Sequence, residues 1–131
     1  MLHIKNILGA VLVCTVLFLL SGCYKNRTVV IDDTPEVTKT VSFSADILPI
    51  FAKDCAVTGC HVSGGKSPDL SADKAYSNLS TGGYLNPSAP DASALYQWMS
   101  GKKGTPMPVS GINATNNGLV LAWIKQGALN N

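Results

Sequence analysis

The segment Cys55-Ala-Val-Thr-Gly-Cys60-His61 places two thiols and one of the chain's 2 histidines close together. Residues five apart on an α-helix point about 140° away from each other, so Cys55 and Cys60 cannot share one face of a regular helix. If both thiols are to serve one group, the chain must leave helical geometry between them, and Gly59 has the backbone freedom for such a turn. Any fold in which the two thiols act together has to place a turn at this segment.

Residues 1–22 have the pattern of a secretory signal. One cation, Lys5, precedes an uncharged apolar run that is shorter than the roughly 20 residues of a membrane-spanning helix. The run ends at Leu20-Ser21-Gly22-Cys23, which resembles the lipobox of bacterial lipoproteins. The resemblance implies cleavage before Cys23 and a diacylglycerol on its thiol. An ordinary signal peptide or an anchor helix with an incidental cysteine is the alternative.

Charge distinguishes few function classes here. The chain has 10 Lys and Arg residues against 8 Asp and Glu residues, with no basic block that would indicate nucleic-acid binding. Residues 23–40 mix Thr, Pro and charged side chains without a sustained period, so we expect a lipidated N-terminus and a flexible tether there. The remaining residues, 41–131, are then left to form one small domain.

That domain is predicted to be all-α, because its apolar residues follow helical spacing in four short segments. The expected helices cover residues 46–54, 71–79, 91–100 and 116–126, between long loops rich in Gly and Pro. Ser44 or Asp46 can cap the first helix, and Pro49, which fits only within a first turn, favours Asp46. Thr115 or Asn116 is expected to cap the last helix, and Gly127 to end it.

The predicted helices also have predicted buried faces. The side chains expected to point inward are Ile47, Ile50, Phe51, Ala75, Leu79, Leu95, Trp98, Met99, Leu119, Val120, Trp123 and Ile124. A core of this size is thin, and small domains of this kind usually need a disulfide, a metal or a large apolar cofactor.

Cys55, Cys60 and His61 offer a place for such a group. In an exported protein the default for two neighbouring cysteines is a disulfide. Two thiols followed by a histidine are also the attachment pattern of c-type haem, in which the cysteines form thioethers and the histidine binds the iron. Structural zinc would need a fourth ligand, and the mature chain has no further Cys or His beyond Cys23.

A second iron ligand is suggested by Pro106-Met107-Pro108. A methionine thioether is a soft ligand that opposes the histidine in many cytochromes c, and flanking prolines hold the backbone extended. Met99 is the competitor, but its neighbours Leu95 and Trp98 favour a place in the core.

Several motifs in order resemble the small cytochrome c domains of bacterial lipoproteins. They are Ser44-Ala-Asp-Ile-Leu-Pro-Ile-Phe, Cys55-x4-Cys60-His61, Pro68-Asp-Leu-Ser, Tyr84-Leu-Asn-Pro, Pro106-Met-Pro and Trp123-Ile-Lys-Gln-Gly-Ala. The resemblance covers about residues 43–131, and the four residues between the cysteines depart from the usual two.

This resemblance implies a class I-like all-α fold of about four short helices around one haem, with the N- and C-terminal helices crossing beside it. It implies covalent attachment through Cys55 and Cys60, and iron ligation by His61 and Met107. It also implies that the carbonyl of Pro68 binds the free N–H of the histidine ring and fixes its tautomer.

The expected function is electron transfer by one c-type haem, with no catalysed reaction. A haem enzyme or ligand sensor is the first alternative, but it would need an open iron position, and an enzyme would need distal acid–base groups; His3 leaves with the signal. A haem-free structural lipoprotein with a Cys55–Cys60 disulfide is the second. The expected partners are redox proteins and, through the lipid, a membrane facing the periplasm or the cell surface. Tyr24, in place of an acidic residue after Cys23, favours the outer membrane.

Replacing Cys23 tests the anchor. Cys23→Ser should block lipidation and leave an uncleaved, mislocalised precursor, which fractionation and mass analysis of the N-terminus would detect. Wild-type protein found free in the periplasm without lipid would contradict the anchor.

Overall fold

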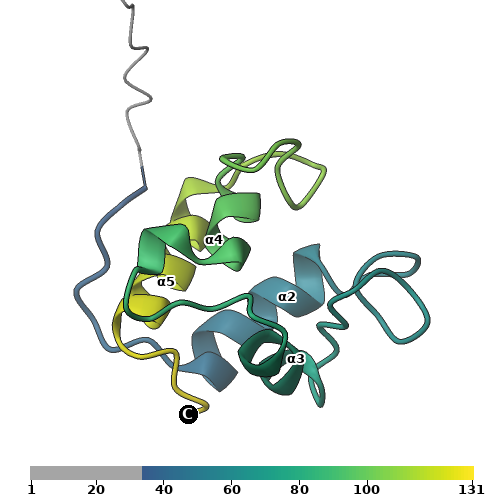
Figure 1. Ribbon diagram of the computed structural model, residues 1–131, viewed down its shortest axis with the longest axis horizontal. Coiled ribbons are helices and arrows are strands. Elements are labelled where there is room, and N and C mark those ends of the chain that lie inside the picture. The colour runs from purple at the N-terminus through teal and green to yellow at the C-terminus, as the bar shows by residue number, and fades with distance from the viewer. Residues whose placement is uncertain (1–33) are drawn as a thin grey trace, which may run out of the picture. The chain divides into compact units, whose positions relative to one another are not determined.

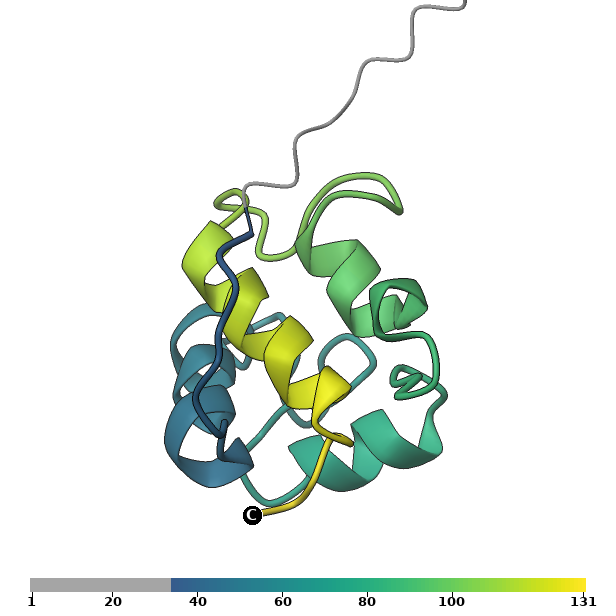
Figure 2. The same cartoon turned by 90° about the vertical axis from the view of Figure 1, so that its left-hand side faces the viewer.

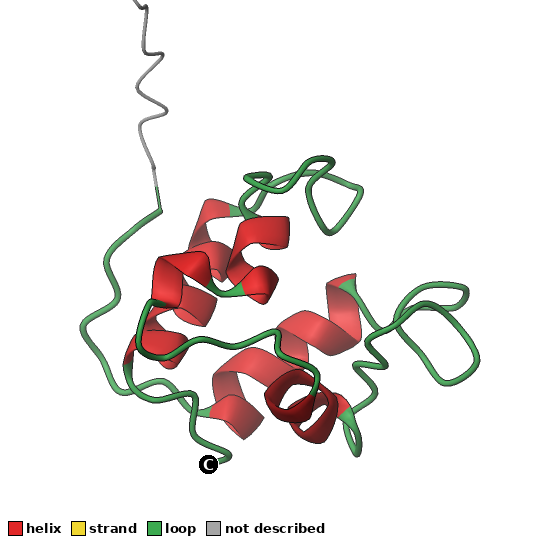
Figure 3. Cartoon of the chain, viewed as in Figure 1, coloured by secondary structure: helices red, strands yellow, loops and turns green. Residues whose placement is uncertain are grey.

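The computed structural model describes residues 34–131, which form an all-α unit without a β-strand in that range (Figure 1, Figure 3). The predicted class of short helices and long loops is confirmed. Its elements are the π-helical turn η1 (Phe43–Ile47), α2 (Leu48–Asp54), α3 (Ala75–Thr81), the 3-10 turn η2 (Pro90–Ala92), α4 (Ala94–Met99) and α5 (Ala114–Lys125). None of these helices has the length and apolar character that crossing a bilayer requires. The predicted signal, Cys23 and the first part of the tether lie outside the described residues.

The first helix begins earlier than predicted, and Asp46 is not its cap. The cap is Ser42, whose Oγ accepts a hydrogen bond from the backbone N–H of Ala45 at 3.2 Å. Asp46 instead accepts from the N–H of Ser42 at 2.9 Å, in the manner of a capping box. Pro49 lies in the first turn of α2, as predicted, and the π-helical turn η1 precedes it: the N–H of Leu48 donates to the carbonyl of Phe43. This wider turn relaxes the constraint that a regular helix would place on the proline.

The C-terminal residue completes this helix start. The backbone N–H of Ser44 donates to the carbonyl of Asn131 at 2.9 Å, and that of Phe43 donates to the Asn131 side chain at 2.8 Å. These bonds satisfy N–H groups that have no partner within the helix. Asn131 therefore lies against the start of η1.

α5 is the central helix of the unit. Its buried residues are Asn117, Gly118, Val120, Leu121, Ala122, Trp123 and Ile124. Three of the four predicted core residues are among them, while Leu119 is only partly buried. The predicted caps Thr115 and Asn116 are wrong by two or three positions. Asn113 is the cap, and its side-chain oxygen accepts from the N–H of Asn116 at 3.0 Å.

The described part of the expected tether, residues 34–40, lies along α5 (Figure 2). A Cβ added to Gly118 would meet the carbonyl oxygen of Pro35 at 2.6 Å, so the two backbones approach closely. At the other end of the helix, the Gln126 side chain accepts from the N–H of Val41 and donates to the carbonyl of Lys39, both at 2.9 Å. This part of the expected tether is thus bound to the domain.

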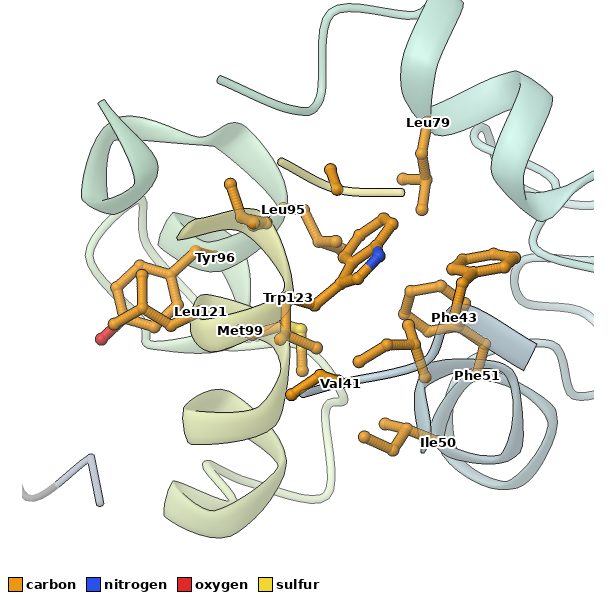
Figure 4. Packing of buried hydrophobic residues seen from close by; sticks show 14 of the residues in the cluster. Val41, Phe43, Ile50, Phe51, Leu79, Leu95, Tyr96, Met99, Leu121 and Trp123 are labelled. Atoms are coloured by element: carbon orange, nitrogen blue, oxygen red, sulfur yellow. The ribbon is translucent and has the colours of Figure 1, made fainter. Parts of the chain in front are cut away.

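Aromatic rings join η1 and α2 to α5. The ring of Phe43 lies 5.2 Å from that of Trp123 and 6.3 Å from that of Phe51, measured between centroids (Figure 4). It also lies 5.3 Å from that of Tyr76. Trp123 is 1% exposed. Ring pairs of this kind are favourable beyond the area that they bury.

The predicted helix over 91–100 is divided in two. Ser93 is buried and extended, because its hydroxyl accepts a hydrogen bond from the N–H of Asn86 at 2.8 Å, and it separates η2 from α4. α4 buries Leu95, Tyr96 and Met99. The predicted burial of Trp98 is wrong: this side chain is 37% exposed, because the break at Ser93 sets a different inward face. α3 starts at Ala75 rather than Ser71, and its inward residues Ala75 and Leu79 are buried as predicted.

Candidate functional site

The segment from Cys55 to His61 lies in the loop that joins α2 to α3, residues 55–74, which we call the cysteine–histidine loop. Cys55 directly follows Asp54, and the backbone leaves helical geometry there. Gly59 has a φ of +80°, the left-handed conformation in which a residue without a Cβ carries little cost. The N–H of His61 donates to the carbonyl of Cys55 at 3.1 Å, which closes the turn. The predicted departure from the helix and the predicted role of Gly59 are both confirmed.

The two cysteines have different surroundings. Cys55 is 8% exposed and belongs to the hydrophobic core, whereas Cys60 is half-buried. Both are free thiols. Burial raises the pKa of the Cys55 thiol to about 11, with smaller contributions from the charges of Asp54 and Cys60. At neutral pH this thiol is therefore protonated in the folded chain.

The ring of His61 is held by one backbone carbonyl. Its Nδ1 lies 2.9 Å from the carbonyl oxygen of Pro68. A carbonyl can only accept, so the proton must sit on Nδ1, and the lone pair of the neutral ring is on Nε2. The hydrogen bond that the resemblance implied for Pro68 is present. It leaves His61 in the tautomer that can offer Nε2 to a metal.

The loop after His61 folds tightly back on itself. The N–H of Lys66 donates to the carbonyl of Cys60 at 2.7 Å, and the N–H of Leu70 donates to the carbonyl of His61 at 2.8 Å. A Cβ added to Gly65 would lie 2.1 Å from the carbonyl oxygen of Cys60, which no other residue could accept without a shift of the backbone. Gly65 is therefore needed for the path of this loop.

Met107 lies in the other long loop, between α4 and α5. It is half-buried, and its N–H donates to the carbonyl of Trp98 at 3.0 Å. Met99, the competing methionine, is 3% exposed and belongs to the core, as predicted. Among the described residues, the hydrogen bonds of Met107 connect it to α4 and not to the cysteine–histidine loop.

The first turn of α5 joins the starting points of these two loops. The side-chain amide of Asn116 donates to the carboxylate of Asp54 at 3.1 Å, at the end of α2. The amide of buried Asn117 donates to the carbonyl of Met99 at 3.3 Å, at the end of α4. Both loops leave the helices on the side of the molecule away from the C-terminus (Figure 1).

Sequence reasoning did not find these two amides, because asparagine at a helix start is expected to cap it. It also did not find Asp69, which binds several side chains of the cysteine–histidine loop.

Within residues 34–131, no three His, Cys, Asp or Glu side chains gather as a metal-binding group. Comparison of the chain with models of protein families, with curated proteins and with solved structures finds no match.

Substitution of Gly65 tests the geometry of the loop. Gly65→Ala should lower the free energy of unfolding by about 2–3 kcal/mol, because the Cβ would overlap the Cys60 carbonyl and displace the backbone. Gly64→Ala is the matched control: Gly64 has a φ of +78° but open space around it, so only the conformational cost of about 1 kcal/mol is expected. Urea unfolding of both variants measures the difference. Equal losses would contradict the close approach.

Proposed function

We propose that residues 41–131 form a cytochrome c domain that carries one covalently bound haem and transfers electrons. The observation that carries this proposal is the hydrogen bond from His61 Nδ1 to the Pro68 carbonyl beside two free thiols. It gives a histidine that can offer Nε2 in the same turn of chain as the two cysteines that thioether attachment requires. When bound, the haem supplies the one-electron chemistry.

The residues of the site fit such a group in their chemistry. The two cysteines would each form a thioether to a vinyl group, and His61 would hold the iron from one side. The turn at Gly59 takes Cys60 off the axis of α2. The two thiols therefore need not share a helix face, and a spacing of four residues between them is compatible with attachment to one group. The burial of Cys55 places the attachment point at the edge of the hydrophobic core, which suits an apolar ring.

We further propose that Met107 would be the second iron ligand and that the fold is class I-like. In support, η1 packs on α5 through Phe43 and Trp123. The first turn of α5 also fixes the start of the loop that carries Met107 and the start of the loop that carries His61. Two loops held at their bases by one helix could each supply a ligand to one haem.

Electron transfer suits these residues better than catalysis. A haem enzyme keeps an iron position open and places acid–base groups beside it. His61 is the only histidine after the predicted signal, and Met107 would occupy the open position. The chain's own part is then to hold the iron between two fixed ligands, so that a change of oxidation state requires little movement. We propose that the lipid at Cys23 keeps the domain at the outer membrane, where it exchanges electrons with redox proteins.

The two methionines provide the test. In oxidised wild-type protein we expect the weak far-red absorption of a sulfur–iron bond, which Met107→Ala should abolish. This variant should also have a lower reduction potential, because a thioether favours ferrous iron, and should bind carbon monoxide more readily. Met99→Ala is the matched control: it should keep the band and lose about 2–5 kcal/mol of stability, as expected for truncation in the core.

Two outcomes would contradict the proposal. If the band survives Met107→Ala and disappears in Met99→Ala, the ligand is Met99. If wild-type iron already binds carbon monoxide rapidly, the iron position is open, and a haem enzyme or ligand sensor is the better account.

A further inference from the structure

Asp69 follows Pro68 directly and is the most connected polar residue of the cysteine–histidine loop. One carboxylate oxygen accepts from the hydroxyl of Ser71 at 2.6 Å and from its backbone N–H at 3.0 Å. The other accepts from the hydroxyl of Ser63 at 2.7 Å and lies 3.5 Å from the ammonium group of Lys74. Lys74 also donates to Ser63 at 2.7 Å, so the group is closed.

The backbone of Asp69 is fixed as well. Its carbonyl accepts a hydrogen bond from the side-chain amide of Asn78, in α3, at 2.8 Å. The carboxylate of Asp69 thus binds Ser63 and Ser71, which lie on the two arms of the loop before and after it, and its backbone binds α3. The hydrogen bonds from Ser71 and Ser63, with the charge of Lys74, hold the pKa of this carboxyl well below its usual range.

The position of Asp69 affects the Pro68 carbonyl through the peptide group that joins these two residues. The carbonyl of Pro68 and the N–H of Asp69 belong to the same rigid unit, so fixing Asp69 restricts where that carbonyl points. Ser63 lies two residues after His61, so the carboxylate also links the histidine side of the loop to the proline side. The bonds from His61 to Pro68 and from Leu70 to His61 lie on either side of Asp69 in the chain.

We propose that Asp69 is a positioning residue for His61: its carboxylate holds the Pro68 carbonyl in place and thereby fixes the tautomer and orientation of the ring. This inference rests on the proposed function for its consequence at iron, but the hydrogen bonds that carry it do not involve haem. A histidine whose Nδ1–H is bound to a carbonyl is a more basic ligand through Nε2. Such a ligand favours ferric iron and lowers the reduction potential.

The variant Asp69→Asn keeps one of the two accepting oxygens of the side chain and removes the other. An amide keeps one accepting oxygen, which can serve Ser71, but its NH2 group cannot accept from Ser63 or pair with Lys74. The hydroxyl of Ser63 then loses its acceptor and Lys74 loses its counter-charge, while the size of the side chain is kept. Asp73→Asn is the matched control, since Asp73 is exposed, carries the same charge and has no side-chain hydrogen bond among the described residues.

The first measurement is solvent exchange of the His61 Nδ1 proton, followed by NMR of ¹⁵N-labelled full-length protein. In Asp69→Asn this exchange should be about tenfold faster than in the wild type, since hydrogen bonds to charged groups are among the stronger ones in proteins. Asp73→Asn should leave the exchange rate unchanged. If Asp69→Asn fails to fold, Ser63→Ala removes only one donor and should give a smaller acceleration in the same direction.

The second measurement is the reduction potential of the haem-loaded protein, which should rise in Asp69→Asn and stay constant in Asp73→Asn. Protein that carries no haem would overturn the proposed function, and the exchange measurement would then decide the role of Asp69 alone. Unchanged exchange in Asp69→Asn, or equal acceleration in the Asp73 control, would overturn the positioning role.

Discussion

The packing of the chain around α5 is the constraint on which the rest of the structure depends. Its middle is buried against the N-terminal helix through Trp123 and Phe43, and its first turn holds the ends of α2 and α4. Its glycine at position 118 lets the backbone of Pro35 pass at close range. In a domain whose other helices have at most seven residues, this one helix contacts η1, η2 and α4.

The site follows from how the loops are held at their bases. Apolar burial fixes the helices, but the path of the loop after Cys55 is set by polar groups: the turn at Gly59, the close approach at Gly65 and the carboxylate of Asp69. Their combined effect is to present His61 in one tautomer beside two thiols. A domain with so little regular structure can hold the ring of His61 in place because the polar groups of this loop find their partners within the loop and α3.

The helices could be predicted from the sequence because Ala75 and Leu79 in α3, and Val120, Trp123 and Ile124 in α5, repeat at helical spacing. Their first residues could not, since these depend on which side chains cap them and on contacts made only in the fold. The first helix starts at a serine that binds a charged side chain within the same turn, and it is completed by Asn131 from the other end of the chain. The break at Ser93 comes from a hydrogen bond to Asn86, and it exchanges Trp98 for Tyr96 in the core. At the site, the need for a turn follows from the cysteine spacing once both thiols are to serve one group. The role of Asp69 does not, because its partners meet only once the loop is folded.

Covalent haem attachment is the central claim, and the mass of the denatured, full-length protein tests it most directly. Protein purified from membranes would be treated with an alkylating reagent in denaturant and examined by intact and peptide mass spectrometry. The account predicts one added haem per chain on the peptide that contains Cys55 and Cys60, with neither thiol alkylated. A peptide without haem, with both cysteines alkylated or joined as a disulfide, would contradict it.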